Sequence, residues 1–149
     1  MKTVIVLLSA CASAPARTST GFPERGEIGD VMARYDQLTK AVDGDGIAAM
    51  FVPDGVIANN DQTIAQGQDT IRTFLKSFTG KVEVVEAATT IETVAVDGER
   101  AHITGSFHQR DRLLPDGTEL QPHGTYDADL VKTPSGWRFV RMHTVPSLK

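Results

Sequence analysis

Three short turns divide the second half of this chain at equal intervals, and they constrain its fold more than any other feature. They are Asp97-Gly98, Asp116-Gly117 and Ser135-Gly136, and such pairs are typical of the tight turns that join antiparallel strands. The segments between them are rich in Val, Thr and Ile, as strands are. We predict strands over residues 82–96, 100–112, 118–132 and 137–145. Strands of this length twist and bend, so this four-strand meander should be strongly curved, with Gly105 and Gly124 as bend points.

The first half of the chain predicts three helical segments. In the first, apolar residues recur every three or four positions and so share one helix face; they are Ile28, Val31, Met32, Tyr35, Leu38 and Val42. Next come a short helix over 47–51, a turn at Pro53-Asp54-Gly55, a short hairpin over 56–59 and 63–66, and a third helix after Gly67. Helices followed by antiparallel strands indicate an α+β domain with the helices packed on one face of the sheet.

The N-terminal segment resembles an export signal. Lys2 precedes an apolar run over 4–8, and small residues lead to Cys11. Leu8-Ser9-Ala10-Cys11 resembles the lipobox of bacterial lipoproteins, in which the Cys becomes the lipid-modified first residue. We therefore expect a signal over 1–11, a flexible tether over 12–26, and a domain over 27–149 on the periplasmic side of a bacterial membrane, lipid-anchored at Cys11. A plain signal peptide, giving a soluble periplasmic or secreted protein, and a cytosolic protein with an apolar first strand are the alternatives.

Charge and composition exclude several function classes. The chain of 149 residues carries 15 Lys and Arg against 19 Asp and Glu, so it lacks the basic surface that binds nucleic acid. It has no run of about 20 apolar residues, so we expect membrane contact only through a lipid anchor. No glycine-rich phosphate loop and no nucleophile motif is present, and no cofactor is expected.

Simple hairpin registers sort the side chains of the meander between two faces, because neighbouring residues alternate. They place His143 opposite Ala128 and Val145 opposite Tyr126. The face predicted to pack on the helices carries Val94, Val96, Ala101, Ile103, Phe107, Tyr126, Ala128, Leu130, Trp137, Phe139, His143 and Val145. The outer face carries His102, Thr104, Ser106, His108, Arg110, His123, Asp127, Asp129, Arg138 and Met142. His108 and His123 lie on adjacent strands, as two metal ligands would. However, the predicted cross-strand partner of His123 is Arg110, and a cation beside a metal ion is unfavourable, so we predict no metal site.

The order of elements and several local motifs resemble the nuclear transport factor 2-like superfamily, in particular its SnoaL-like and ketosteroid-isomerase-like branches. The motifs are Arg34-Tyr35, Gly44-Asp45-Gly46-Ile47, Phe51 with Pro53-Asp54-Gly55, Gly67, Gly136-Trp137-Arg138-Phe139 and His143. The resemblance implies a cone-shaped fold in which three helical segments pack on a strongly curved antiparallel sheet, a meander plus a hairpin. It also implies an apolar cavity and a homodimer formed through the outer sheet face.

The resemblance also implies where a site would lie. In the isomerase branch a helix Tyr and a strand acid bind an oxyanion while a carboxylate moves a proton. Tyr35 matches the helix Tyr, Asn59 occupies the carboxylate position, and Tyr126 is the inner-face residue near the acid position. Because an amide cannot act as a general base, His143 is the best remaining acid–base candidate. Tyr35 is the second catalytic candidate. The predicted ligand-binding residues are Tyr35, Asn59, Phe74, Phe107, Tyr126, Trp137 and His143.

Three function hypotheses follow from this reading. The first is an exported domain that binds a small hydrophobic or aromatic molecule, without assigned catalysis. The second is an enzyme of isomerase, cyclase or dehydratase type that uses His143 with Tyr35 or Tyr126. The third is a protein-interaction or dimerisation module that uses the outer sheet face.

Overall fold

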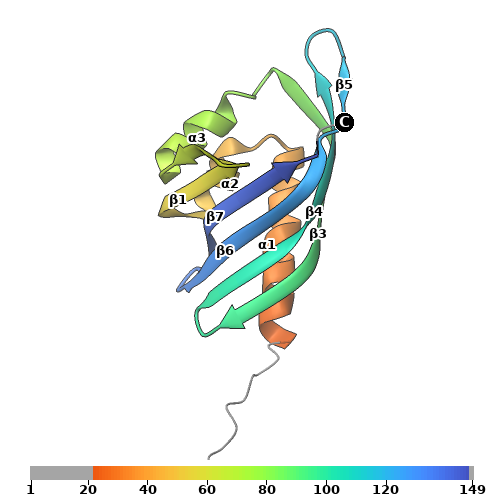
Figure 1. Cartoon of the computed structure of the whole chain (residues 1–149). Helices are drawn as coiled ribbons and strands as arrows, with labels where there is room; N and C mark the ends of the chain where they lie inside the picture. The colour runs from red at the N-terminus through yellow and green to blue at the C-terminus, as the bar shows by residue number, and fades with distance from the viewer. Residues whose placement is uncertain (1–21, 148–149) are drawn as a thin grey trace, which may run out of the picture.

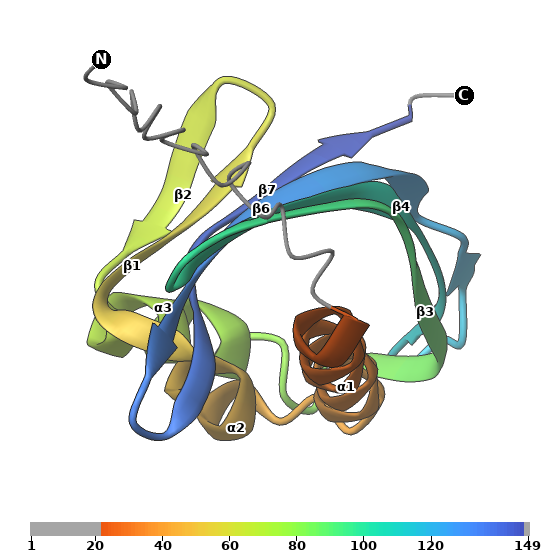
Figure 2. The ribbon, with the colours of Figure 1, turned by 90° about the horizontal axis from the view of Figure 1, so that it is seen from below.

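Helices fill the concave side of a curved sheet in the computed structural model, which describes residues 22–147 (Figures 1 and 2). The helices are α1 (Phe22–Lys40), α2 (Gly44–Ala49) and α3 (Gln68–Lys76). The strands are β1 (Phe51–Asn59), β2 (Gln62–Gln66), β3 (Val82–Asp97), β4 (Arg100–Leu113), β5 (Glu119–Leu120), β6 (His123–Thr133) and β7 (Gly136–Pro146). None of the helices in this part of the chain is long and apolar enough to span a bilayer. The predicted α+β architecture is confirmed.

Helix α1 begins five residues before the predicted start of the domain. Residues 22–26 were assigned to the tether, but they form its first turns. Pro23 fits there because the first helical turn needs no N–H from it, and Glu24 places an acidic group near the positive end of the helix. The predicted signal over 1–11, Cys11 and the rest of the tether lie outside the described residues.

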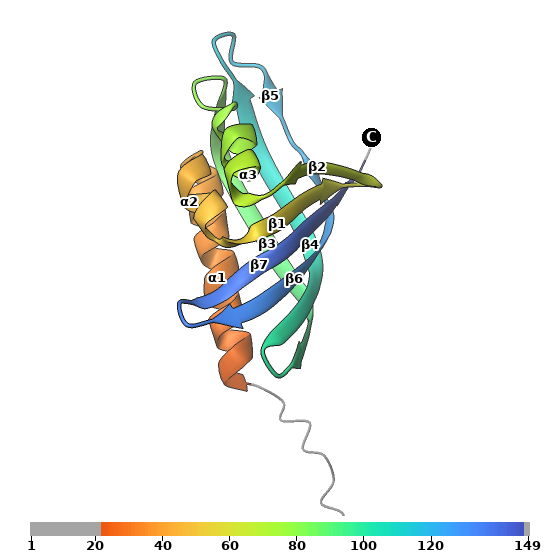
Figure 3. The same ribbon diagram turned by 90° about the vertical axis from the view of Figure 1, so that its left-hand side faces the viewer.

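The sheet is mixed, whereas the prediction was a wholly antiparallel one. Its order is β2-β1-β7-β6-β4-β3, with β5 paired to β4. The meander β3-β4-β6-β7 and the hairpin β1-β2 are antiparallel as predicted. However, the hairpin joins the meander through β1, which runs parallel to β7. Figure 3 shows β1 and β7 side by side, with the helices to one side of them.

Strand β1 occupies a segment predicted as a helix end and a turn. Phe51 starts the strand, and Pro53-Asp54-Gly55 lies inside it. Pairing with β7 is interrupted between Phe51 and Val56. Because Pro has no N–H for a ladder, it is tolerated where the ladder is interrupted. The predicted strand over 118–132 is likewise split into β5 and β6 by Gln121-Pro122.

The strand registers differ from simple hairpins in two ways with different consequences. In β3-β4 and β4-β6 the partners shift by two residues, so that Ile103 lies opposite Val94 and Ala128. A shift by two keeps the side chains of β4 and β6 on their predicted faces. In β3, register shifts of one residue also occur between Val84 and Glu86 and between Ile91 and Thr93. In β6-β7, however, Phe139 pairs with Leu130 and Arg141 with Asp129, so Val140 is one extra residue. This bulge reverses the two faces for the rest of β7.

The bulge overturns the predicted placement of three side chains. His143 lies opposite Asp127 on the outer face, not opposite Ala128. Val145 is 41% exposed instead of inward. Met142, predicted to face outward, is 3% exposed and joins the core. The end of β7 therefore presents Met142 and Thr144 to the concave side.

Candidate functional site

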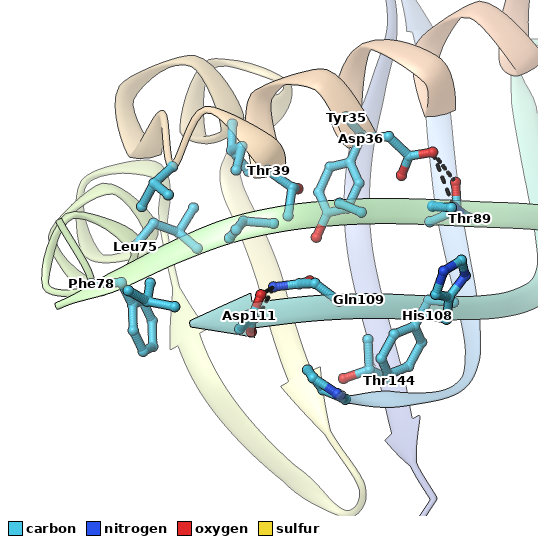
Figure 4. A pocket seen from close by; sticks show the side chains of 18 of the residues that line it. Tyr35, Asp36, Thr39, Leu75, Phe78, Thr89, His108, Gln109, Asp111 and Thr144 are labelled. Atoms are coloured by element: carbon cyan, nitrogen blue, oxygen red, sulfur yellow. Dashed lines mark hydrogen bonds between the residues drawn. The ribbon is translucent and has the colours of Figure 1, made fainter. Parts of the chain in front are cut away.

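A cavity of about 490 Å³ lies between the helices and the concave face of the sheet. Its wall is mostly apolar, with side chains from α3 such as Phe74 and Leu75, and Val84, Phe107 and Met142 from the sheet. The apolar wall also contains seven polar or titratable residues; they are Tyr35, Asp36, Thr39, Thr89, Gln109, Asp111 and Tyr126. Asn59, His108 and Thr144 complete the polar lining. Figure 4 shows Tyr35 and Asp36 projecting from α1 toward the strands.

Tyr126 presents the most informative polar atom in this wall. The residue is only 4% exposed, and its hydroxyl has no hydrogen-bond partner among the described residues. Burial, with the charges of Asp36 and Glu92 adding to it, raises the pKa of Tyr126 to about 12. Buried polar groups are nearly always hydrogen-bonded, so the Tyr126 hydroxyl calls for an explanation.

Asp36 places a carboxyl group in the same wall. Its Oδ2 accepts hydrogen bonds from the backbone N–H and the side-chain hydroxyl of Thr89, both at 3.0 Å. Burial raises the pKa of Asp36 despite these two donors. Burial also raises the pKa of Tyr35, and the charge of the adjacent Asp36 adds to that effect. The carboxyl group is therefore held in place and is easier to protonate than a carboxyl group in water.

Asp111 is a second carboxyl group in the wall, on β4. It is 8% exposed, and the Gln109 amide donates to its Oδ1 at 2.8 Å and to its Oδ2 at 3.0 Å. Burial raises the pKa of Asp111 as well. Within residues 22–147 no three His, Cys, Asp or Glu side chains lie close enough together to hold a metal ion.

Residues 22–143 match the SnoaL-like domain family. The chain belongs to this family. No curated protein sequence matches the SnoaL-like chain. Among solved structures, it is similar to a protein of unknown function from Mycobacterium tuberculosis, with 22% identity and a TM-score of 0.74 over 85% of this chain and 78% of the other.

Two further solved structures share the fold of this SnoaL-like domain. A ketosteroid isomerase-like protein from Erwinia carotovora atroseptica has 19% identity and a TM-score of 0.73, over 85% of this chain and 98% of that one. A nuclear transport factor 2-like superfamily protein from Salmonella enterica has 18% identity and a TM-score of 0.71, over 85% and 93%. These similarities confirm the predicted cone-type fold, and the family match confirms the predicted SnoaL-like resemblance.

Five of the seven predicted ligand-binding residues line the cavity of the SnoaL-like domain. They are Tyr35, Asn59, Phe74, Phe107 and Tyr126. Trp137 does not: it is 5% exposed in the core, and its indole N–H donates to Glu27 Oε2 at 2.9 Å. The aromatic ring therefore anchors β7 to α1 and is not part of the cavity wall.

His143, the leading acid–base candidate, also lies outside the cavity. Its Nδ1 is 2.6 Å from Asp127 Oδ1, and its Nε2 is 2.8 Å from the backbone carbonyl oxygen of Asn60. Asp127 also contacts Arg141 at 3.4 Å. His143 thus connects β6 and β7 to the β1-β2 turn, and its predicted place on the concave face is wrong because of the Val140 bulge.

Sequence reasoning missed the two carboxyl groups of the site. Gln109 and Asp111 continue the alternation that includes Ile103 and Phe107, so extending that pattern along β4 would have placed them inward. Asp36 follows Met32 by four positions, which puts both near one helix face. Tyr35 was compared with the helix Tyr of the isomerase branch, and the next residue, Asp36, was not considered as a site residue.

The outer face also departs from the prediction at the His pair. His123 lies opposite His108, not Arg110. His108 contacts Glu86 Oε1 at 3.0 Å and borders the cavity wall, while His123 Nδ1 is 3.1 Å from the Gln121 carbonyl oxygen. Each ring therefore has its own nearby partner.

Proposed function

We propose that this SnoaL-like domain binds a small hydrophobic or aromatic molecule in its cavity. The observation that carries the proposal is the Tyr126 hydroxyl, which is buried in the cavity wall with no partner in the part of the chain that the structure describes. Leaving a buried hydroxyl unpaired costs about 1–3 kcal/mol. A ligand with one polar group would supply the missing hydrogen bond while its apolar body contacts the surrounding wall.

The dimensions and the lining of the cavity support this proposal. Small-molecule sites have volumes of about 300–1,000 Å³ and are mostly apolar with a few fixed polar groups. The cavity has about 490 Å³, and Asp36, Asp111 and Tyr126 are its fixed polar groups. The Thr89 and Gln109 hydrogen bonds hold the two carboxyl groups before any ligand arrives.

A pair of variants on one strand tests the proposal. Ala87 lies in the cavity wall opposite Gln109, and Ala95 is exposed further along β3. Ala87→Phe should fill the cavity and abolish binding of a neutral fluorescent probe such as Nile red, whereas Ala95→Phe should leave its binding unchanged. Equal binding by the two variants, or no binding by the unaltered chain, would contradict the proposal.

A second candidate function is an isomerase, cyclase or dehydratase, with Asp36 in the role first given to His143. The observation that favours it is a carboxyl group of raised pKa in the same cavity as the free Tyr126 hydroxyl. A general base with a raised pKa removes a proton more effectively near neutral pH. Tyr126 would donate a hydrogen bond to the oxygen on which negative charge develops.

The enzyme hypothesis has a direct test in Asp36→Asn. Asn retains an oxygen that accepts the Thr89 hydrogen bonds but cannot take up a proton at neutral pH. Turnover of cyclic ketones, measured by absorbance, should fall at least about a hundredfold in this variant. Undiminished turnover would remove Asp36 from the mechanism and leave binding as the function.

Export, anchoring and self-association remain proposals that rest on the sequence. We propose that Cys11 carries lipid on the periplasmic side of a bacterial membrane; labelled palmitate should enter the chain and not its Cys11→Ala variant. We propose that the outer sheet face, with His108, Arg110, His123 and Asp127, forms a homodimer or docks a partner. Sedimentation at several concentrations tests the dimer, and a monomer at all of them would contradict it.

A further inference from the structure

The cavity wall has an unusual charge composition. Two of its lining residues are acidic, Asp36 and Asp111, while none of those that residues 22–147 contribute is Lys or Arg. His108 borders the wall, but one of its ring nitrogens is directed to Glu86 at 3.0 Å. A molecule entering the cavity therefore meets carboxyl groups and hydroxyls, and no fixed cation.

Neither carboxyl group has a cationic partner within residues 22–147. Asp36 accepts only from Thr89, and Asp111 only from Gln109, all neutral donors. Buried charges in proteins are usually paired with an opposite charge. Burial raises the pKa of both groups because their charged forms lose contact with water. A cation supplied by a ligand would replace that lost stabilisation.

Asp36 is the better placed of the two to receive a ligand. Both Thr89 hydrogen bonds end on its Oδ2, so Oδ1 has no donor in the described structure. Both oxygens of Asp111 already accept from Gln109. The charge of Asp36 also acts on the Tyr126 hydroxyl, which is buried, unpartnered and part of the same wall.

We infer that the cavity selects hydrophobic molecules that carry an ammonium group and rejects those that carry a carboxylate, with Asp36 as the counter-charge. An ammonium group has three donors and no acceptor. Its N–H groups match Asp36 Oδ1, which has no donor among the described residues, and the oxygen of the Tyr126 hydroxyl. Aromatic rings in the wall, such as Phe107, add a further attraction for cations. A carboxylate would face like charge and lose its water. The inference rests on the proposed binding function and narrows it to a ligand class.

Three probes with one ring system separate these contributions. They are 2-naphthylmethylamine, 2-naphthylmethanol and 2-naphthoate, which differ in charge and share the apolar body. In calorimetric titrations of the whole chain at pH 7, the amine should bind at least about tenfold more tightly than the alcohol, as charge-assisted hydrogen bonds do. The carboxylate should bind at least about tenfold more weakly than the alcohol.

Asp36→Asn should reduce amine affinity to that of the alcohol, because the side-chain shape is kept while the counter-charge is lost. Asp30→Asn is the matched control, since Asp30 is exposed on the same helix and does not line the cavity; it should change none of the three affinities. Thermal melting of both variants confirms that they are folded.

The outcomes distinguish a failure of the ammonium preference from a failure of the proposed small-molecule binding. If the alcohol binds but the amine binds no more tightly, or the carboxylate binds equally well, the inference is wrong and the cavity still binds small molecules. If the amine preference survives in Asp36→Asn, the counter-charge is not Asp36 and the inference fails in that part. If none of the three binds, the proposed function itself fails. The comparison on the unaltered chain needs no variant to fold.

Discussion

Asp36 and Thr89 are joined by two hydrogen bonds that end on the same carboxylate oxygen, each 3.0 Å long. The pair ties α1 to β3 and fixes the direction in which the carboxyl group faces the cavity (Figure 4). Two bonds to one oxygen leave the other without a donor. A structural contact between a helix and the sheet therefore also prepares a binding group.

Replacing Asp36 by Asn should change how stability depends on pH. The folded state raises the pKa of Asp36, so it binds the proton more readily than the unfolded chain does. Asp36 therefore contributes most to the free energy of unfolding at low pH, and this contribution is lost as pH rises through the unfolded and then the folded pKa. Urea unfolding between pH 3 and pH 7 should show the difference between the unaltered chain and Asp36→Asn falling as pH rises. A difference that rises with pH would contradict the assigned shift.

Tyr126→Phe should stabilise the empty protein. The variant removes a buried hydroxyl that has no partner and keeps the ring that fills the wall. Relief of that unpaired group is expected to raise the free energy of unfolding by about 1 kcal/mol. Denaturant unfolding without ligand measures it. A loss of 1 kcal/mol or more would mean that the hydroxyl has a partner in the folded state.

His143→Ala should weaken the fold without changing the cavity. The imidazole contacts Asp127 and the Asn60 carbonyl oxygen on the outer side of the sheet, and losing both contacts should cost about 1–3 kcal/mol. Binding of a neutral cavity probe should remain within about twofold. The neighbouring Met142 lines the cavity, so Met142→Ala should alter probe affinity as well as stability. Loss of binding in His143→Ala alone would place the histidine back in the site.

Two glycines should respond to alanine in opposite ways. A Cβ on Gly105 would lie 1.9 Å from the Thr90 carbonyl oxygen and 2.9 Å from Tyr126 Cε1. Since the first clash is with backbone, Gly105→Ala should lower the free energy of unfolding by about 3 kcal/mol or more. A Cβ on Gly29 meets nothing within 4 Å, and Gly29→Ala in α1 should stabilise by about 0.5–1 kcal/mol. Circular dichroism during denaturation compares them, and equal effects would contradict the packing around Gly105.

The elements that local patterns specify were predicted well from the sequence. The Asp97-Gly98 and Ser135-Gly136 turns and the helical stripe of Met32 and Leu38 lie where expected, because turn chemistry and periodicity act over a few residues. The parallel contact of β1 with β7 was missed because no local signal records which strands meet. Tyr35 and Tyr126 line the cavity: Tyr35 was found from the helical stripe and the family resemblance, and Tyr126 from strand alternation.

The site was mispredicted after Val140, because this extra residue in β7 reverses which side chains face the cavity. His143 was assigned to the concave side because alternation was carried through β7 without interruption. A bulge at Val140 leaves no mark in composition or propensity that would distinguish it from regular strand. Asp36 was missed for a different reason: an acidic residue beside an apolar stripe resembles a solvated helix edge until tertiary structure places Thr89 against it.

The extra residue at Val140 also governs how related sequences should be compared with this one. In a relative whose last strand lacks it, the position aligned with His143 by simple counting would face the concave side of the sheet, and the position aligned with Met142 would face outward. Residue identities downstream of β7's bulge therefore transfer between family members only when a one-residue gap is placed there. A single deletion at Val140 would turn the His143 imidazole from the outer face to the concave face of the sheet.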